Sequence, residues 1–410
     1  MFKKNFRMKN LLISSVQKFS QKKLIYFLLF FVFFNSCSAA PLSQSPVPQE
    51  NETKVFSTST LEEPTPTVFL PLIVKSPDSK FFGVYLKQYW TENNVIPILS
   101  ELDNLTGKKH SSVGWFIDLE DDAFTKPVTD LSHNNLHRQL ESLWQGGYTS
   151  FINLGSNATA ADIINGLRDK EIGYVVEFYK SWIGLGDGRK AMIAPLQEMN
   201  GDWTVYGQQS TSDQYKQAYV YIYNKFLQNN INREDVWWVF APNGWNDPNE
   251  PERQFENYYP GDEFVDVVGF SSYNYGYCLP ETSVKWETYA EMLEPFINRM
   301  ETMAPTKPII IAETATTAYY DYDQKDISLK NQWLIDSYNY LGTKQSVAGV
   351  YYFNFSEFDG YVCDFEILNI GWNEVTENYF FDNFYTGYRD AINNSKYDYL
   401  PIQALKLLFR

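Results

Sequence analysis

The sequence predicts an α/β protein whose strands close into a (β/α)8 barrel, and three observations support this prediction. Eight short apolar runs recur along the chain from residue 81 onward. Amphipathic stretches of helical length separate these runs, which is typical of βαβ units and a parallel sheet. The eight units occupy roughly 325 residues, which lies within the usual size range of such a barrel.

The eight expected strands are each short and apolar, and each is bounded by turn residues or helical patterns. They are Phe82–Leu86, Ser112–Asp118, Thr149–Asn153, Ala191–Gln197, Val236–Ala241, Val265–Ser271, Pro308–Ala312 and Ala348–Asn354. Helices are expected over Asp213–Leu227, Trp286–Met303 and Lys330–Leu341. A doubly wound open sheet is the alternative, but no glycine-rich turn follows the first strand. The glycines of residues 184–188 follow a helical pattern instead and indicate a loop.

The chain begins with an export segment. Seven Lys and Arg residues precede Leu24–Phe34, an apolar run of 11 residues that is short for a membrane span. Cys37 follows closely, as in a bacterial lipoprotein signal. We therefore expect residues 1–37 to be a signal segment of lipoprotein type, with Cys37 lipidated. Ordinary cleavage near residues 38–40, giving a secreted protein without an anchor, is the alternative.

Residues 38–78 are rich in Pro, Ser, Thr and Glu, and such a composition predicts an extended linker. Residues 79–410 are expected to form the barrel domain. An export signal followed by a linker predicts an extracellular protein, either secreted or lipid-anchored at the cell surface. We expect contact with the membrane only through that anchor, and we expect a monomer.

Composition narrows the classes of partner. A formal net charge of −16 argues against nucleic acid, because phosphates require clustered Lys and Arg. Aromatic residues make up 17% of the chain, which suits stacking on sugar rings but equally suits a core. With three His, three Cys and no CxxC pair, neither a metal site nor a cofactor is expected. Apart from Cys37, Cys278 and Cys363 are left as a pair that is compatible with one disulfide.

Two glutamates follow strongly apolar strands. In barrels of this class the catalytic groups lie where strands end and loops begin. Glu198 follows the fourth expected strand and Glu313 follows the seventh. A carboxylate in such a place is partly desolvated, which is costly unless the group is paired or used. A salt bridge or a helix cap explains one such residue, whereas two at corresponding strand ends predict a catalytic pair.

Three motifs resemble glycoside hydrolase family 26. They are Gln-Glu-Met-Asn-Gly-Asp-Trp at 197–203, the segment Tyr258–Gly269, and Lys307–Glu313. The family belongs to a retaining clan with the acid/base on strand four and the nucleophile on strand seven, and acts mostly on mannan. The resemblance implies that Glu198 is the acid/base and Glu313 the nucleophile of an endo-β-1,4-mannanase-like enzyme. Mixed-linkage β-glucan and xylan are the alternative substrates.

The retaining mechanism sets a geometric expectation for these two glutamates. The two carboxyl groups should lie ~5–5.5 Å apart, against ~6.5–9.5 Å for an inverting enzyme. The negative charge of Glu313 would help to keep Glu198 protonated as the acid. Acid and nucleophile are both side chains, so the reaction requires no cofactor.

The resemblance also implies residues that line the sugar site. Tyr273 matches a tyrosine that hydrogen-bonds the nucleophile, although packing at the barrel rim is its alternative role. Trp203 matches a tryptophan at the sugar site. Trp115 and Trp245 are expected to be either stacking platforms or core residues.

Further binding residues are expected from strand ends and from two departures from the family pattern. Asn243 and Asp118 are candidate binders of sugar hydroxyls. Gln197 stands where the family usually has His, and an amide there can still bond a hydroxyl. The family's strand-eight Trp is missing, and Trp372 is expected to fold back in its place. Both departures concern the subsite where the bond breaks, so they leave the substrate open.

Two other classes of function remain. A barrel that binds glycans without turnover is one, but such a protein needs neither glutamate. A surface scaffold for adhesion is the other; the linker permits it but nothing requires it.

Overall fold

The computed structural model describes residues 79–86, 95–125, 134–245, 249–279, 285–321, 324–358, 361–373, 376, 378–394 and 396–409. The structural statements below concern these residues. The signal segment expected for residues 1–37, the lipidation of Cys37 and the linker expected for residues 38–78 lie outside them.

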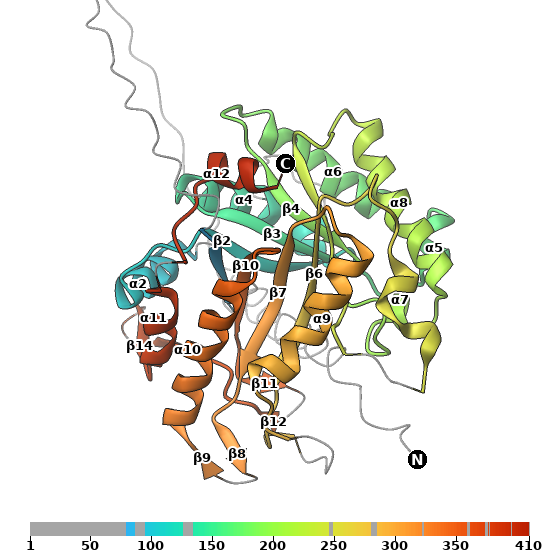
Figure 1. Ribbon diagram of the computed structural model, residues 1–410. Helices are drawn as coiled ribbons and strands as arrows, with labels where there is room; N and C mark the ends of the chain where they lie inside the picture. The colour runs from blue at the N-terminus through green and yellow to red at the C-terminus, as the bar shows by residue number, and fades with distance from the viewer. Residues whose placement is uncertain are drawn as a thin grey trace, which may run out of the picture. The chain divides into compact units, whose positions relative to one another are not determined.

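Parallel strands close into a barrel in the order β1-β10-β7-β6-β5-β4-β3-β2 (Figure 1). Nearly all of their residues are buried, because side chains fill the interior and helices cover the outside. All eight expected strands are present, with small shifts at their ends, so the predicted barrel is confirmed. The strands are β1 (Phe81–Leu86), β2 (Ser112–Asp118), β3 (Thr149–Gly155), β4 (Ala191–Pro195), β5 (Val236–Phe240), β6 (Val267–Asn274), β7 (Ile309–Thr316) and β10 (Val347–Asn354).

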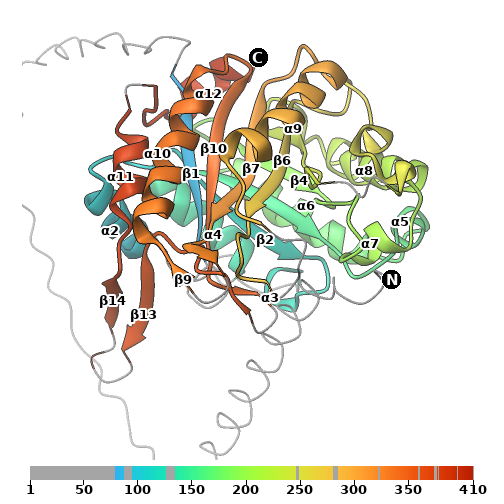
Figure 2. The same ribbon diagram turned by 60° about the horizontal axis from the view of Figure 1, so that its bottom comes forward.

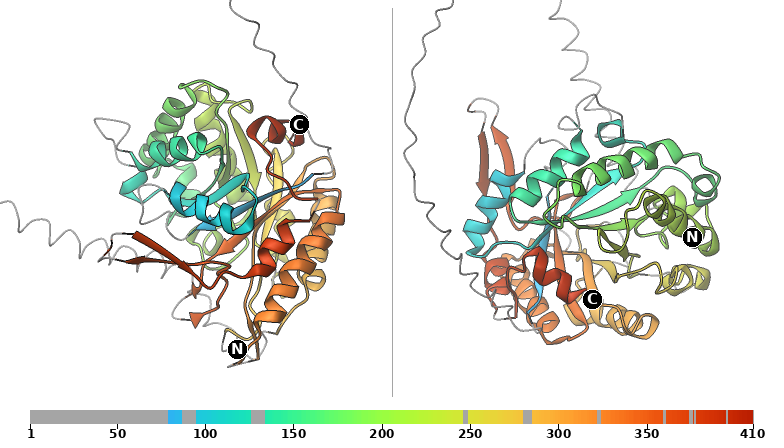
Figure 3. Two further views of the ribbon diagram at one scale, coloured as in Figure 1. Left: turned by 90° about the vertical axis from the view of Figure 1, so that its left-hand side faces the viewer. Right: turned by 90° about the horizontal axis from the view of Figure 1, so that it is seen from above.

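Helices surround the barrel (Figures 1 and 3). They are α2 (Ile96–Thr106), α3 (Asp122–Thr125), α4 (Asn135–Gln145), α5 (Ala160–Ile164), α6 (Asp169–Ile183), α7 (Val205–Gln208), α8 (Ser212–Gln228), α9 (Tyr289–Met303), α10 (Ile327–Thr343), α11 (Thr386–Ile392) and α12 (Ile402–Leu408), with 3-10 turns η3 (Pro251–Arg253) and η4 (Phe255–Tyr258). No helix among the described residues is long and apolar enough to cross a membrane.

Capping residues explain where the predicted helices start. Thr211 closes a capping box with Gln214, so α8 begins at Ser212, one residue before its expected start. Thr288 closes another with Glu291, so α9 begins three residues later than the apolar pattern suggested. Asp326 accepts from the Leu329 backbone and starts α10 three residues early.

The barrel interior accounts for much of the aromatic content. The rings of Tyr85, Phe151 and Tyr351 meet inside the barrel, with centroids 5.0 Å apart for Phe151 and Tyr351. Gly114 makes room for Tyr85, because a Cβ there would lie 2.2 Å from that ring. Many of the aromatic residues therefore pack in the core, which is one of the two roles that the composition allowed.

Short antiparallel sheets and a disulfide elaborate the segments that follow β6, β7 and β10. The sheets pair β8 (Tyr319–Asp321) with β9 (Gln324–Lys325), β11 (Glu357–Phe358) with β12 (Tyr361–Val362), and β13 (Asn369–Asn373) with β14 (Asn378–Asp382). The β13–β14 hairpin projects away from the barrel (Figures 2 and 3). The expected pairing of Cys278 with Cys363 is present and ties the segment after β6 to the segment after β12.

Candidate active site

The backbone around Glu198 turns sharply where β4 ends. Leu196 and Glu198 both adopt left-handed conformations, with φ of 54° and 53°, which non-glycine residues rarely do. Neighbouring strands hold this turn: Leu196 N–H donates to the Leu154 carbonyl at 2.7 Å, and Glu198 N–H to the Ala241 carbonyl at 2.8 Å. Such strain persists only where the surroundings fix it, and it is typical of functional sites.

Three donors hold the Glu198 carboxylate, which is only 2% exposed. Trp203 Nε1 donates to Oε2 at 2.9 Å, and Asn243 Nδ2 donates to Oε1 at 3.2 Å. The Ser271 hydroxyl donates to the same Oε1. Gly201 lets the indole approach, because a Cβ there would lie 2.4 Å from the Trp203 ring.

Asn243 is itself fixed by a reciprocal pair of hydrogen bonds with Asn200. Asn200 Nδ2 donates to the Asn243 carbonyl, and Asn243 N–H donates to Asn200 Oδ1, each at 2.8 Å. The motif residues 197–203 therefore supply the Glu198 carboxylate and the Trp203 indole that donates to it. They also supply Asn200, which orients the Asn243 amide that donates to the same carboxylate. This local arrangement explains why the motif is compact in sequence.

Glu313 lies inside β7 and is also 2% exposed. A register shift between Phe270 and Ser271 leaves β7 with one extra residue, so Glu313 pairs with Ser271. Such bulges re-aim side chains and recur beside active sites. The Tyr273 hydroxyl donates to Glu313 Oε2, and Asn153 Nδ2 lies 3.5 Å from Oε1.

Strand β6 brings the two carboxylates together. Ser271 pairs with Glu313 across the sheet and donates to Glu198, while Tyr273, two residues farther along the same face, donates to Glu313. The pKa values of Tyr85 and Tyr273 report the same proximity. Burial raises both well above the ordinary value, and the charges of Glu313 and Glu198 raise them further. The predicted pair thus occupies one end of the barrel.

The predicted aromatic platforms divide into three cases. Trp245 is 55% exposed beside Asn243, whose Oδ1 accepts from the Trp245 N–H at 2.9 Å. Trp115 is 1% exposed and packs against Phe124, as the core alternative expects. Trp372 lies in β13, but its side chain is outside the described part of the chain.

Gln197 lies next to the acid/base candidate and is partly buried. Its backbone carbonyl accepts from the Tyr206 hydroxyl at 2.8 Å. Its side-chain Oε1 is buried and has no hydrogen-bond partner among the described residues. An unpaired buried oxygen costs free energy, so a donor from a bound ligand would stabilise it.

Asp118 stands at the end of β2, where its carboxyl contacts that of Glu120. Burial raises the pKa of Asp118 to about 8, and the contact with Glu120 adds to the shift. Burial opposes ionisation of Glu120, yet hydrogen bonds from Asp118, Asn157 and Ser156 hold the pKa of Glu120 below its usual value. The two carboxyl groups are thus shifted in opposite directions, with the pKa of Asp118 raised and that of Glu120 lowered.

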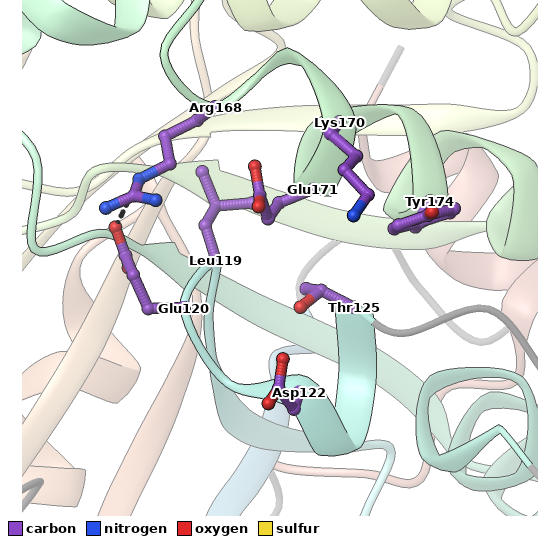
Figure 4. A pocket seen from close by; sticks show the side chains of 8 residues that line it. All are labelled: Leu119, Glu120, Asp122, Thr125, Arg168, Lys170, Glu171 and Tyr174. Carbon is purple, nitrogen blue, oxygen red and sulfur yellow. Dashed lines mark ion pairs between the residues drawn. The ribbon is translucent and has the colours of Figure 1, made fainter.

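A hollow of about 270 Å³ adjoins this carboxyl pair (Figure 4). Glu120 lines it and forms an ion pair with Arg168 at 2.7 Å. Neither Glu198 nor Glu313 lines it, so the hollow is separate from the carboxylate pair. Its other lining residues are Leu119, Asp122, Thr125, Lys170, Glu171 and Tyr174.

Sequence reasoning missed two residues that contact the Glu198–Glu313 pair, and it missed Glu120, which contacts Asp118. Asn153 interrupts the apolar run Phe-Ile-Asn-Leu of the third strand, and a polar residue there was a usable signal. Ser271 carried no such signal, because its role depends on the register between β6 and β7. Glu120 stood in an acidic run after strand two, which is more often a solvated loop.

Comparison with known proteins follows the same lines. The model of Glycosyl hydrolase family 26 matches residues 188–338. Endoglucanase H of Acetivibrio thermocellus is 26% identical over 269 residues, which cover 64% of this chain and 27% of that protein. A mannan endo-1,4-beta-mannosidase of Bacillus subtilis is 28% identical over 125 residues, covering 28% of each chain. The chain thus spans only about a quarter of the length of these curated relatives.

Solved structures share the fold. The catalytic domain of the endo-beta-1,4-mannanase from Bacillus sp. JAMB-750 aligns with a TM-score of 0.57 at 16% identity, over 80% of this chain and 90% of that chain. A beta-mannanase from a symbiotic protist of the termite Reticulitermes speratus, complexed with a gluco-manno-oligosaccharide, aligns with a TM-score of 0.53 at 13% identity, over the same shares. These structures show that the barrel fold is shared, and the family match over residues 188–338 shows that this part of the chain is similar to glycosyl hydrolase family 26.

Proposed function

We propose that the protein is a retaining glycoside hydrolase that cleaves internal bonds of a β-linked polysaccharide. The observation that carries the proposal is the buried carboxylate pair, with Glu198 and Glu313 supplied by β4 and β7 and joined through β6. The match of residues 188–338 to the model of Glycosyl hydrolase family 26 supports the reaction class.

The proposed reaction is a double displacement. Glu313 attacks the anomeric carbon while Glu198 gives its proton to the leaving oxygen, which releases the first sugar product. Glu198 then takes a proton from water, and the resulting hydroxide breaks the bond to Glu313. The Tyr273 hydroxyl stabilises negative charge on Glu313 before attack and after release.

The proposed substrate is β-1,4-mannan, because the curated mannosidase and the structural relatives with TM-scores above 0.5 are described as mannanases. Mixed-linkage β-glucan is the second candidate, because the longer curated alignment is with an endoglucanase. The buried Oε1 of Gln197 has no partner among the described residues and could accept a hydrogen bond from a hydroxyl of either substrate. Trp245 offers an exposed ring beside the acid/base for a neighbouring sugar.

The test is hydrolysis of mannan, mixed-linkage β-glucan and xylan by the full chain, measured as new reducing ends. Glu198→Ala and Glu313→Ala are compared with Glu177→Ala, an exposed glutamate of α6 that serves as the matched control. We expect wild type and the control to cleave one polymer and both site variants to lose that activity. Equal inertness of all four on a broad glycan panel would favour the binding barrel instead.

We further propose that the enzyme acts outside the cell, anchored through Cys37. The export pattern of residues 1–37 and the Cys278–Cys363 disulfide both support an oxidising, extracytoplasmic location. Metabolic labelling with a fatty acid should mark the wild type and leave Cys37→Ser unlabelled. Secretion of an unlabelled wild-type protein would instead favour cleavage near residues 38–40.

A further inference from the structure

One buried segment packs directly beneath the tyrosine that contacts Glu313. Phe365 is fully buried, and its ring stacks on Tyr273 with centroids 5.7 Å apart and planes 19° apart. Tyr275 and Phe353 close the remaining sides of Tyr273, at 5.8 Å and 5.5 Å. The position of the Tyr273 hydroxyl on Glu313 therefore depends on where this aromatic cluster sits.

The backbone on either side of Phe365 is held by an internal lysine. Lys330 of α10 is fully buried, and its ammonium donates to the carbonyls of Asp364 and Glu366, the latter at 2.8 Å. Its Nζ also lies 3.9 Å from the centre of the Tyr385 ring. A lysine is almost never fully buried unless its donors are satisfied, so these bonds account for its presence in the core.

The same segment is fixed at every neighbouring residue. The Tyr352 hydroxyl donates to the Phe365 carbonyl at 2.7 Å. Asn354 Oδ1 accepts from the backbone of Ile367 and Leu368 at 2.7 and 3.1 Å. Cys363, bonded to Cys278, closes the other end. So many restraints on a few residues are unnecessary for covering a core, and they hold one ring in one place.

We propose that Lys330 and Phe365 are positioning residues for the reaction: Lys330 grips the carbonyls that flank Phe365, and the Phe365 ring sets the Tyr273 hydroxyl against Glu313. This inference rests on the proposed function, because Glu313 is its endpoint. Neither residue touches substrate. Lys330 and Phe365 affect the reaction only by positioning Tyr273, so a double-mutant cycle that includes Tyr273 tests the proposal.

The test is a double-mutant cycle with Phe365→Leu, Tyr273→Phe and the double variant, read as pH profiles of kcat/KM. Removing a donor from an ionised nucleophile moves the acidic limb of the profile to higher pH. We expect Phe365→Leu to move that limb as Tyr273→Phe does, and to lower kcat/KM by up to about 10²-fold. In the Tyr273→Phe background, Phe365→Leu should lower kcat/KM by less than about twofold, because the hydroxyl through which Phe365 acts is already absent.

Matched variants separate positioning from stability. Phe82→Leu removes the same atoms from another fully buried phenylalanine, which packs on His110, and should leave the acidic limb in place. Lys330→Met keeps the length of the side chain but not its donors, and should move the limb in the same direction as Phe365→Leu. An equal loss from Phe365→Leu in both backgrounds, with the limb unmoved, overturns the inference.

A second readout does not depend on turnover. A crystal structure of Phe365→Leu should show the Tyr273 hydroxyl withdrawn from Glu313 Oε2. If that contact is unchanged, the inference fails whatever the activity. If wild type is inert on every glycan while the contact is broken in the variant, the proposed function fails and the positioning role stands.

Discussion

The two carboxylates of the candidate site are held in different ways. Glu198 sits on a strained turn and takes two of its donors, Trp203 and Asn243, from the motif or from a residue that the motif brackets. Glu313 sits inside β7, next to a bulge, and depends on Tyr273 and Asn153, which come from β6 and β3. Glu198 thus has one donor, Trp203, from its own local sequence besides its distant donors, whereas both donors of Glu313 come from other strands.

This difference predicts which substitutions should disturb each of the two carboxylates. Glu198 should be sensitive to changes close to it in sequence as well as to changes at its distant donors, since the turn and the indole are encoded together. Damage to Glu313 should come from residues far away, including those that position Tyr273. The predictions below break or sharpen this contrast, from the largest expected effect to the smallest.

Removing the nucleophile should have the largest effect. Glu313→Ala eliminates the covalent step, and we expect kcat/KM to fall by about 10⁵-fold or more. The loss should be the same for polysaccharides and for aryl glycosides with a good leaving group, because both must be attacked at carbon. Steady-state kinetics on both substrate types measures it. A smaller loss on the aryl glycoside would indicate that Glu313 is not the nucleophile.

Removing the acid should cost less and should depend on the leaving group. Glu198→Ala is expected to lower kcat/KM on the polymer by about 10²–10⁴-fold. On an aryl glycoside whose leaving group needs no proton, the bond-breaking step should be nearly unaffected. Pre-steady-state kinetics on that substrate would reveal a burst followed by slow turnover. Equal losses on both substrates would contradict the assignment of Glu198.

Removing one donor from each carboxylate should affect opposite limbs of the pH profile. Trp203→Phe takes the indole N–H from Glu198 and should move the alkaline limb to higher pH, because ionisation of the acid becomes harder. Tyr273→Phe should move only the acidic limb. The buried pair Trp238→Phe and Tyr397→Phe, remote from the carboxylates, provides matched controls that should move neither. If Trp203→Phe and Tyr273→Phe moved the same limb, this would contradict the assignment of the two limbs to two different carboxylates.

The smallest effect concerns the buried lysine on the Glu313 side. Burial lowers the pKa of Lys330 to about 7, against the raising influence of Asp364 and Glu366 and with a further lowering by Lys325. In the unfolded chain this lysine has its ordinary pKa of about 10.4. Between pH values of about 7 and about 10.4 the unfolded state therefore binds more protons than the folded state. Stability should therefore fall as pH drops through that window.

Lys330→Met should lack this part of the slope, and thermal unfolding from pH 7 to 10 measures it. We expect the Tm difference between wild type and Lys330→Met to change by a few degrees over the window, growing in favour of wild type toward high pH. A parallel pair of curves would mean that Lys330 stays charged in the folded protein across the whole range.

Much of the fold could be predicted because strands and helices are local patterns. Apolar runs located all eight barrel strands, with small errors at their ends. The predicted helices differ mainly at their starts, which caps such as Thr288 and Asp326 determine. Glu198 and Glu313 could be found because strand position and chemistry coincide there. Trp115 was ambiguous, since a tryptophan looks the same in sequence whether it faces a core or a ligand.

The rest of the site could not be predicted because it depends on register and on distant packing. Ser271 reaches Glu198 only because a bulge sets the pairing of β6 with β7. Phe365 reaches Tyr273 across 92 positions of sequence, and nothing in its own neighbourhood indicates a role. The raised pKa of Asp118 likewise depends on burial beside Glu120.

The most direct test of the central claim is chemical rescue by azide, with the product's anomeric configuration determined by NMR. Glu198→Ala should be reactivated on an activated β-glycoside to give the β-glycosyl azide, because azide replaces water in the second displacement. Glu313→Ala should be reactivated to give the α-glycosyl azide, because azide then attacks directly. The opposite configurations, or an inverted sugar product from the wild type, would contradict the assignment of Glu198 as acid/base and Glu313 as nucleophile.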